Sequence, residues 1–255
     1  MKRPKTKLTA AAAIAVVVII ITRGMHCCNQ KASIVKHPAL SEETDIDDAT
    51  AFELVSLDIN IPRLRFFTEP FSMRPVSNLQ ENNGFGKSRE VLLIPIGTKN
   101  VALGKPVCST DIDPLTFGNI EMVTDGKKKG NEYNYVELSS GLQSVTIDLL
   151  DVYTIYAIVF WHNTKYAGPV YFDVIVQASN DRDFIKDVKT LFNNDHDNSA
   201  NFGIGKDKHY RETCYGKLID ADGTQARYVR LYSNGNNSDE FNHYVEVEVY
   251  GKAVK

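Results

Sequence analysis

Residues 144–162, SVTIDLLDVYTIYAIVFWH, contain the two patterns that decide the fold class. In 144–149 apolar residues alternate with polar ones, which predicts a β-strand with one buried face. The run 152–161 is apolar or aromatic nearly throughout, as expected of a strand that is covered on both faces. Both patterns predict β structure in this part of the chain.

Strand patterns recur along the rest of the chain, at 170–178, 226–232 and 244–250. In the last of these we expect the valines to face inward and Glu246 and Glu248 to face outward. Turn sequences separate the strands, among them Asp125-Gly126, Asp222-Gly223 and Ser233-Asn234-Gly235. Because no long amphipathic helix pattern lies between them, the sequence predicts an all-β antiparallel jelly-roll sandwich over residues 99–255.

Composition excludes several classes of protein and of partner. The chain has 255 residues, of which 43% are hydrophobic and 24% charged, so it is not collagen-like, wholly disordered or a multi-span membrane protein. A net charge of -3 and a pI near 6.1 predict no nucleic-acid partner. The G-x-S-x-G, H-E-x-x-H and C-x-x-C patterns are absent from the sequence, and we expect no enzymatic activity.

The N-terminus has the layout of an export signal. Lysine and arginine residues precede a charge-free run at 8–22, LTAAAAIAVVVIIIT, which predicts an N-terminal hydrophobic helix. We expect residues 1–28 to be a signal peptide or a signal-anchor. The run is short for a permanent span, no A-x-A cleavage site follows, and Cys27 and Cys28 leave lipidation as a third alternative. All three place the bulk of the chain outside the cytoplasm, in the periplasm or at the cell surface, with membrane contact only through this segment.

Residues 29–98 show no sustained period of a helix or a strand. Prolines interrupt the segment at irregular intervals, and 41–48, SEETDIDD, is acidic. We expect an extended linker or strap that packs in part on the domain that follows.

Several segments, in their order along the chain, resemble the discoidin or coagulation-factor C-type domain, a galactose-binding-like jelly roll. They are NVALGKPV (100–107), VTDG (123–126), SVTIDL (144–149), ARYVRLYSNG (226–235) and HYVEVEVYG (243–251). The resemblance covers about residues 100–251. It implies a non-catalytic sandwich that binds glycans, lipids or proteins through loops at one end.

The resemblance also implies a structural Ca²⁺ bound by Asp125 of the turn and Glu246 of the last strand. Three lysines at 127–129 follow the turn, where further oxygen ligands would be needed, and ammonium groups oppose a cation. A calcium site and a plain turn with a lysine surface both stay open.

The loop at 193–199, NNDHDNS, has the most unusual local sequence. Its aspartates have the spacing of a calcium loop, but Ala200 and Lys206 stand where an EF-hand needs glycine and glutamate. Three alternatives stay open for this loop. It is a turn held by its own side chains, a ligand-binding loop, or a metal site completed by residues from elsewhere in the fold.

We expect the ligand-binding residues at strand ends and in loops. Imidazole, amide and carboxylate groups there match the hydrogen-bond donors and acceptors of a sugar. We nominate His162, Asp195, His196, Asn198, Asn234 and His243. Trp161, the only tryptophan, is expected in the core rather than stacked on a ligand. The expected ligand is a glycan or cell-surface polysaccharide. The alternatives are a protein-contact or adhesion module of the same fold, acting on another envelope protein, and a metal-dependent hydrolase with its metal at 195–199.

Export would permit a disulfide bond between Cys108 and Cys214, both within the β-domain. Such a bond would close a loop of over a hundred residues and stabilise the fold by about 4–5 kcal/mol in the chain-entropy model. It forms only if the Cα atoms lie within about 7 Å of each other.

Overall fold

The computed structural model describes residues 53–62, 73–80, 91–111, 117–128, 134–164 and 168–254. The expected signal segment and hydrophobic helix at 1–28 lie outside the described residues, as does most of the expected strap. Among the helices of the described residues, none is long and apolar enough to cross a membrane.

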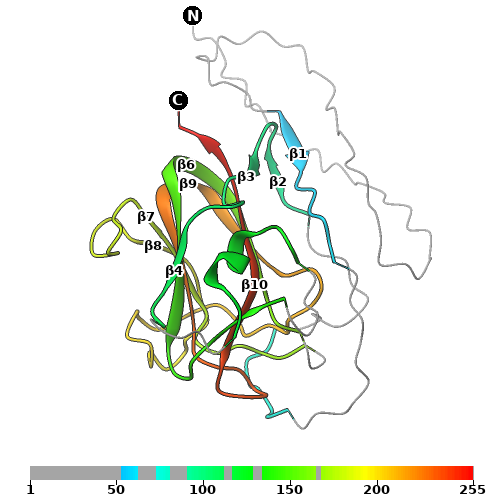
Figure 1. Ribbon diagram of the computed structural model, residues 1–255, viewed down its shortest axis with the longest axis vertical. Helices are drawn as coiled ribbons and strands as arrows, with labels where there is room; N and C mark the ends of the chain where they lie inside the picture. The colour runs from blue at the N-terminus through cyan, green and yellow to red at the C-terminus, as the bar shows by residue number, and fades with distance from the viewer. Residues whose placement is uncertain are drawn as a thin grey trace, which may run out of the picture.

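Ten strands and one 3₁₀ helix make up the described fold (Figure 1). In chain order they are β1 (Leu54–Ser56), β2 (Leu93–Pro95), β3 (Lys99–Asn100), β4 (Val107–Ser109), η1 (Ile120–Thr124), β5 (Val136–Leu138), β6 (Gln143–His162), β7 (Ile175–Ser179), β8 (Lys189–Asn193), β9 (Lys217–Ser233) and β10 (Asn242–Ala253). The ladders between these strands are all antiparallel. The prediction of an antiparallel all-β fold is therefore confirmed.

The two long strands, β6 and β9, each contribute to both layers of the sandwich. Residues 143–148 of β6 pair with the end of β9, and 153–160 pair with its beginning. Between Asp148 and Tyr153 the register shifts, and Leu150 adopts a φ of 68°. Such an irregularity bends a strand, so the first half of β6 lies with β4, β7 and β8, and its second half lies with β10 and β3 (Figure 1).

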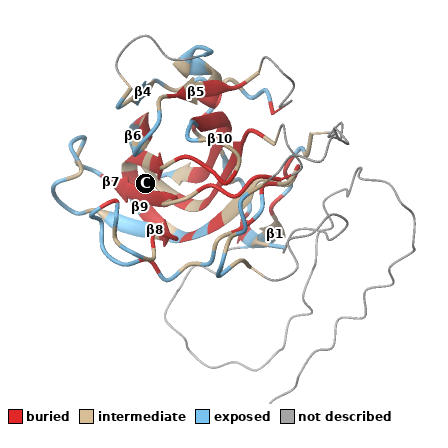
Figure 2. Cartoon of the chain, turned by 90° about the horizontal axis from the view of Figure 1, so that it is seen from below, coloured by how far each residue is buried: buried red, intermediate tan, exposed pale blue. Residues whose placement is uncertain are grey.

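The main core lies between the two layers, where Figure 2 shows buried residues concentrated. Its fully buried members alternate within 145–149, 158–160, 229–231 and 247–249, and a register shift after Ile155 interrupts the alternation in β6. They include Val145, Ile147, Leu149, Ile155, Ile158, Phe160, Val229, Leu231, Val247 and Val249. A fully buried aliphatic side chain of this size stabilises the fold by about 1.5–3 kcal/mol.

A second cluster covers the outer face of the β6–β10 layer. Val159 and Trp161 of β6 lie on this face, and Leu57, Ile59 and Ile94 from the segment before the sandwich pack on it. The part of the run at 157–161 is therefore buried on both faces, as predicted, whereas 152–154 and Tyr156 are half-buried. Trp161 is 2% exposed and its Nε1 donates to the Cys214 carbonyl at 3.0 Å, so it is a core residue.

Two details of β10 differ from the sequence prediction. A register shift between Tyr244 and Glu246 places Val245 in the outer cluster, away from Val247. Glu246 and Glu248 are buried, at 0% and 6% exposure, rather than solvated. The alternating pattern identified the strand but missed the bulge, and it contained no sign of the segments that cover its outer face.

The disulfide bond that export would permit between Cys108 and Cys214 is not formed in this structure. Cys108 lies on β4 and pairs with Thr146, near the start of β6. The Cys214 carbonyl contacts Trp161, near the end of β6. Because the two cysteines lie beside opposite halves of one long strand, their side chains do not meet.

Candidate functional site

A cavity of about 130 Å³ opens at the loop end of the sandwich. Its walls come from β5, the residues that follow β6, the segment before β7, the β9–β10 loop and the start of β10. The lining residues are Tyr135, Glu137, Asn163, Pro169, Tyr171, Asn236, Ser238, Asp239 and His243. The volume is close to that of an engineered cavity of about 150 Å³ that holds a benzene ring, so it accommodates one ring-sized group.

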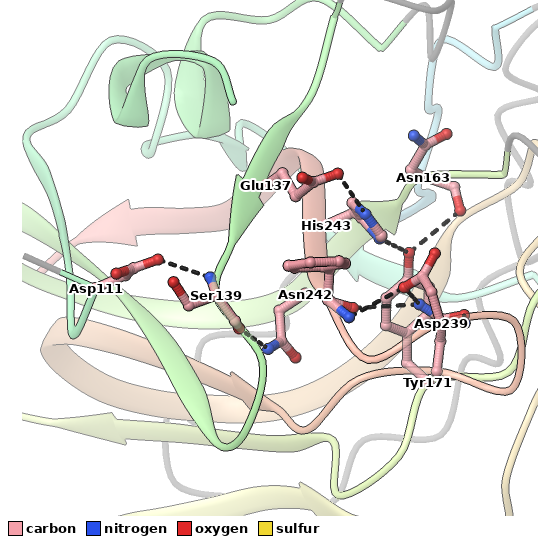
Figure 3. A network of polar contacts seen from close by, with 10 residues as sticks. Asp111, Glu137, Ser139, Asn163, Tyr171, Asp239, Asn242 and His243 are labelled. Atoms are coloured by element: carbon pink, nitrogen blue, oxygen red, sulfur yellow. Dashed lines mark hydrogen bonds and ion pairs between the residues drawn. The ribbon is translucent and has the colours of Figure 1, made fainter. Parts of the chain in front are cut away.

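His243 links two walls of the cavity. Its Nε2 lies 3.0 Å from Glu137 Oε2, and its Nδ1 lies 2.9 Å from the Tyr171 hydroxyl (Figure 3). Since a carboxylate only accepts, Nε2–H donates to Glu137, and in the neutral ring Nδ1 accepts from Tyr171. Burial is the main cause that lowers the pKa of His243 below its ordinary value, so the neutral imidazole fits these contacts.

The loop between β9 and β10 is held by its own amides. Asn236 Oδ1 accepts from the backbone N–H groups of Ser238 and Asp239 at 2.8 and 3.0 Å, and its Nδ2 donates to Asp239 Oδ1 at 2.7 Å. Asn242 donates to the Ser139 carbonyl at 2.8 Å. Gly235 has a φ of 69°, which favours glycine. These bonds fix the cavity wall before any ligand arrives.

The segment at 73–80 forms further hydrogen bonds to the β9–β10 loop. Arg74 Nη2 donates to the Asn236 carbonyl at 2.8 Å, and Asn237 Nδ2 donates to the Arg74 carbonyl at 3.1 Å. One part of the expected strap region therefore contacts the loop end, while Leu57 and Ile59 cover a sheet face.

His162, nominated from its position at a strand end, lies beneath the cavity. Its Nδ1 is 2.7 Å from Glu212 Oε1, and both side chains are 0% exposed. Its ring stacks on Tyr171 with centroids 4.0 Å apart. The contact of His162 with a ligand stays a prediction, but in this structure its direct effect is to support Tyr171.

The loop at 193–199 is held by side-chain caps. The buried carboxylate of Asp195 accepts from the N–H groups of Ser199 at 3.1 Å and Ala200 at 2.9 Å. Asn198 Oδ1 accepts from Gly203 N–H at 2.7 Å. His196 Nε2 lies 2.8 Å from the Asp207 carbonyl. These contacts match the alternative of a turn held by its own side chains.

Three carboxylates gather beside this loop, where oxygens of Asp173, Asp195 and Asp197 lie within 4.8 Å of one another. Asn234 Nδ2 donates to Asp173 Oδ2 at 2.8 Å, and Ser199 Oγ donates to the same oxygen at 3.0 Å. The metal-dependent hydrolase alternative would need a cation here. The hydrogen bonds from Asn234 and Ser199 already stabilise part of the negative charge of these carboxylates, because hydrogen bonds to a carboxylate favour its ionised form.

The structure therefore sorts the six nominated residues into groups at one end of the sandwich. His243 lines the cavity and His162 lies beneath it, whereas Asp195 and Asn234 meet at Asp173. Backbone bonds between Phe172 and the segment at 234–235 join the two groups. Sequence reasoning missed most cavity residues, because they come from separate strands and carry no shared motif: Tyr135, Glu137, Asn163, Tyr171 and Asp239.

The corner where the resemblance implies calcium contains a buried ammonium. Lys128 Nζ lies 2.7 Å from Glu248 Oε1, with both side chains 7% exposed, and 4.7 Å from the Trp161 ring centroid. Lys128 is therefore buried, whereas the alternative of a plain turn places it among lysines on the surface. A lysine in this position donates and cannot serve as a ligand for a cation.

The two expected calcium ligands already have other partners. Asp125 accepts from Lys127 through both backbone N–H, at 2.8 Å, and Nζ, at 3.0 Å. Glu246 Oε2 accepts from Gly126 N–H at 3.0 Å, and burial raises the pKa of Glu246 to about 9. Ca²⁺ takes six to eight oxygen ligands, and the ammonium of Lys128 in this corner opposes a second cation. The calcium site implied by the resemblance stays a prediction.

No family model matches the sequence, and no curated protein matches it. Among solved structures, the chain is similar to a family 89 glycoside hydrolase from Clostridium perfringens, with 18% identity, a TM-score of 0.45, and coverage of 61% of this chain and 15% of the hydrolase. A fucose-binding module from Streptococcus pneumoniae is 17% identical with a TM-score of 0.43, covering 60% of this chain and 97% of the module. A fucolectin from Morone saxatilis (striped bass) serum is 17% identical with a TM-score of 0.43, covering 61% of this chain and 50% of the lectin. The similar structures thus include a fucose-binding module and a lectin.

Proposed function

We propose that this chain is a non-catalytic carbohydrate-binding protein and that the cavity at the loop end holds the sugar. The observation that carries the proposal is the convergence of two tyrosines with carboxylate, amide and hydroxyl groups around one ring-sized cavity. Sugar sites combine an aromatic surface with a few converging polar groups of this kind.

Three features suit the cavity to a ligand with hydroxyl groups. The Ser238 Oγ atom is buried, lines the cavity and has no hydrogen-bond partner in the protein. Tyr135 packs on the partly exposed Phe117, with ring centroids 5.0 Å apart, which widens the aromatic surface. The loop that carries Ser238 is fixed by Asn236, so little ordering is needed on binding.

A screen of the purified chain on immobilised glycans, followed by titration of any hit, tests the proposal. Each ligand hydrogen bond contributes about 0.5–1.5 kcal/mol, so Ser238→Ala should weaken binding by about two- to tenfold without changing the thermal unfolding midpoint. Asp183→Asn is the matched control, because Asp183 is exposed in the loop after β7, at the opposite end of that strand. Equal affinity of both variants for the hit would place the sugar elsewhere.

One observation favours the protein-contact alternative. Leu54, Leu93 and Ile96 lie in or next to the β1–β2 ladder, and each is about half exposed, at 46%, 54% and 49%. Neighbouring exposed apolar side chains are typical of contact surfaces. Failure of every glycan in the screen, together with loss of retention on an envelope extract in Leu93→Ser, would support this alternative instead.

Export to the periplasm or cell surface is also a proposal, supported by the basic residues and the apolar run at 8–22. Fractionation of cells that express the full chain tests it. We expect the protein in the membrane or outside the cytoplasm, and recovery of an intact soluble chain from the cytosol would contradict export.

A further inference from the structure

The cavity carries negative charge on two of its walls. Glu137 and Asp239 line it, and among the described lining residues there is no lysine or arginine. Arg74 approaches the same loop, but its Nη2 is bonded to the Asn236 carbonyl, and Arg74 is not among the lining residues. The charged groups that line the cavity are therefore the carboxylates of Glu137 and Asp239.

His243 does not neutralise these carboxylates. Its Nε2 donates to Glu137 at 3.0 Å, and the Tyr171 hydroxyl, 2.9 Å from Nδ1, provides the donor that the neutral ring needs there. Burial also lowers the pKa of His243, which keeps the ring neutral at neutral pH.

Both carboxylates act on the same place in the cavity. Burial raises the pKa of Tyr171 well above its ordinary value, and the charges of Glu212, Asp239 and Glu137 add to this effect. The Tyr171 hydroxyl therefore stays protonated, and it lines the same cavity as the carboxylates of Glu137 and Asp239. Carboxylates attract a cation that enters the cavity and repel an anion.

We propose that the sugar held by this cavity is an amino sugar with a free ammonium group, such as a glucosamine unit, and not an acidic sugar. This inference rests on the proposed carbohydrate-binding function. An ammonium offers three N–H donors, which match the carboxylates of Glu137 and Asp239. An N-acetylated unit loses the charge, and a uronate would place a third carboxylate beside the two that are present.

Isothermal titration with three matched tetramers tests the inference: a glucosamine oligomer, its N-acetylated counterpart and an oligouronate. We expect the glucosamine oligomer to bind at least tenfold more tightly than the N-acetylated one, and the oligouronate not to bind. The preference should decrease as salt is added, because salt screens charge. Glu137→Gln and Asp239→Asn should each reduce the preference for the glucosamine oligomer several-fold. Asp183→Asn removes one negative charge away from the cavity and should leave this preference unchanged. That result would exclude a general attraction between the oligomer and the negatively charged protein.

The outcomes separate the two levels of the proposal. Equal binding of the glucosamine and N-acetylated oligomers, or tighter binding of the oligouronate, would overturn the amino-sugar inference while leaving carbohydrate binding in place. A preference that both carboxylate variants retain would also overturn it, because the charge would then act elsewhere. Absence of binding to all three oligomers and to every glycan of the wider screen would defeat the proposed function itself.

Discussion

Replacement of Lys128 by methionine should destabilise the fold far more than the same replacement at the adjacent Lys127. Lys128 forms a 2.7 Å ion pair with Glu248, both side chains being 7% exposed. Loss of one partner of a buried pair costs about 3–5 kcal/mol, because the other charge is left buried. The contact with the Trp161 ring at 4.7 Å adds about 0.5–2 kcal/mol. Lys127, whose side chain is 71% exposed, pairs with Asp125 at the surface, and such a pair contributes at most about 1 kcal/mol.

Urea unfolding followed by the fluorescence of Trp161, the only tryptophan, measures both variants. We expect Lys128→Met to lose at least about 3 kcal/mol more than Lys127→Met, which corresponds to a difference of about 6–12 °C in Tm for a domain of this size. The double variant Lys128→Met/Glu248→Gln should recover part of the loss, because it removes the unpaired carboxylate. A difference under about 1 kcal/mol between the two single variants would refute the assignment of Lys128 as a buried counter-ion.

Three further predictions follow from the same structure. Wild-type Tm should be equal in CaCl₂ and in EGTA, since the buried ammonium of Lys128 occupies the corner where the resemblance implies calcium; a rise of several degrees with CaCl₂ would contradict this. Because the folded pKa of Glu246 is raised to about 9, stability should be lost as pH rises toward that value, by up to about 1.4 kcal/mol per pH unit between pH 7 and 9. Glu246→Gln should remove this slope in urea titrations, and an equal slope in both proteins would exclude Glu246 as its source. In the native protein a thiol reagent should modify the exposed Cys108 much faster than the buried Cys214, as mass spectrometry of the digested chain would show.

Local sequence patterns predicted much of the fold because they reflect burial directly. The alternation in 144–149 corresponds to the inward face of β6, and the part of the apolar run at 157–161 is covered on both sides as expected. The same reasoning failed at Val245, because a bulge changes which face a residue occupies without changing the sequence pattern.

The candidate site was predicted less well, because its residues meet only through the pairing of strands. Glu137 and His243 are opposite each other in the β5–β10 ladder, over a hundred positions apart in sequence. His162 also lies at the expected end, yet its partner Glu212 holds it in the core. Lys128 looked like one of three surface lysines, and its burial depends on Glu248, which no local pattern connects to it.

The most direct test of the account is a titration of the full chain with its best-binding glycan, followed by amide-proton NMR. The account predicts that the largest shifts fall on Tyr135, Glu137, Ser238 and His243 around the cavity, and that the loop at 180–187 does not respond. Shifts confined to the β1–β2 ladder, or no response to any glycan, would contradict the assignment of the cavity as a carbohydrate site.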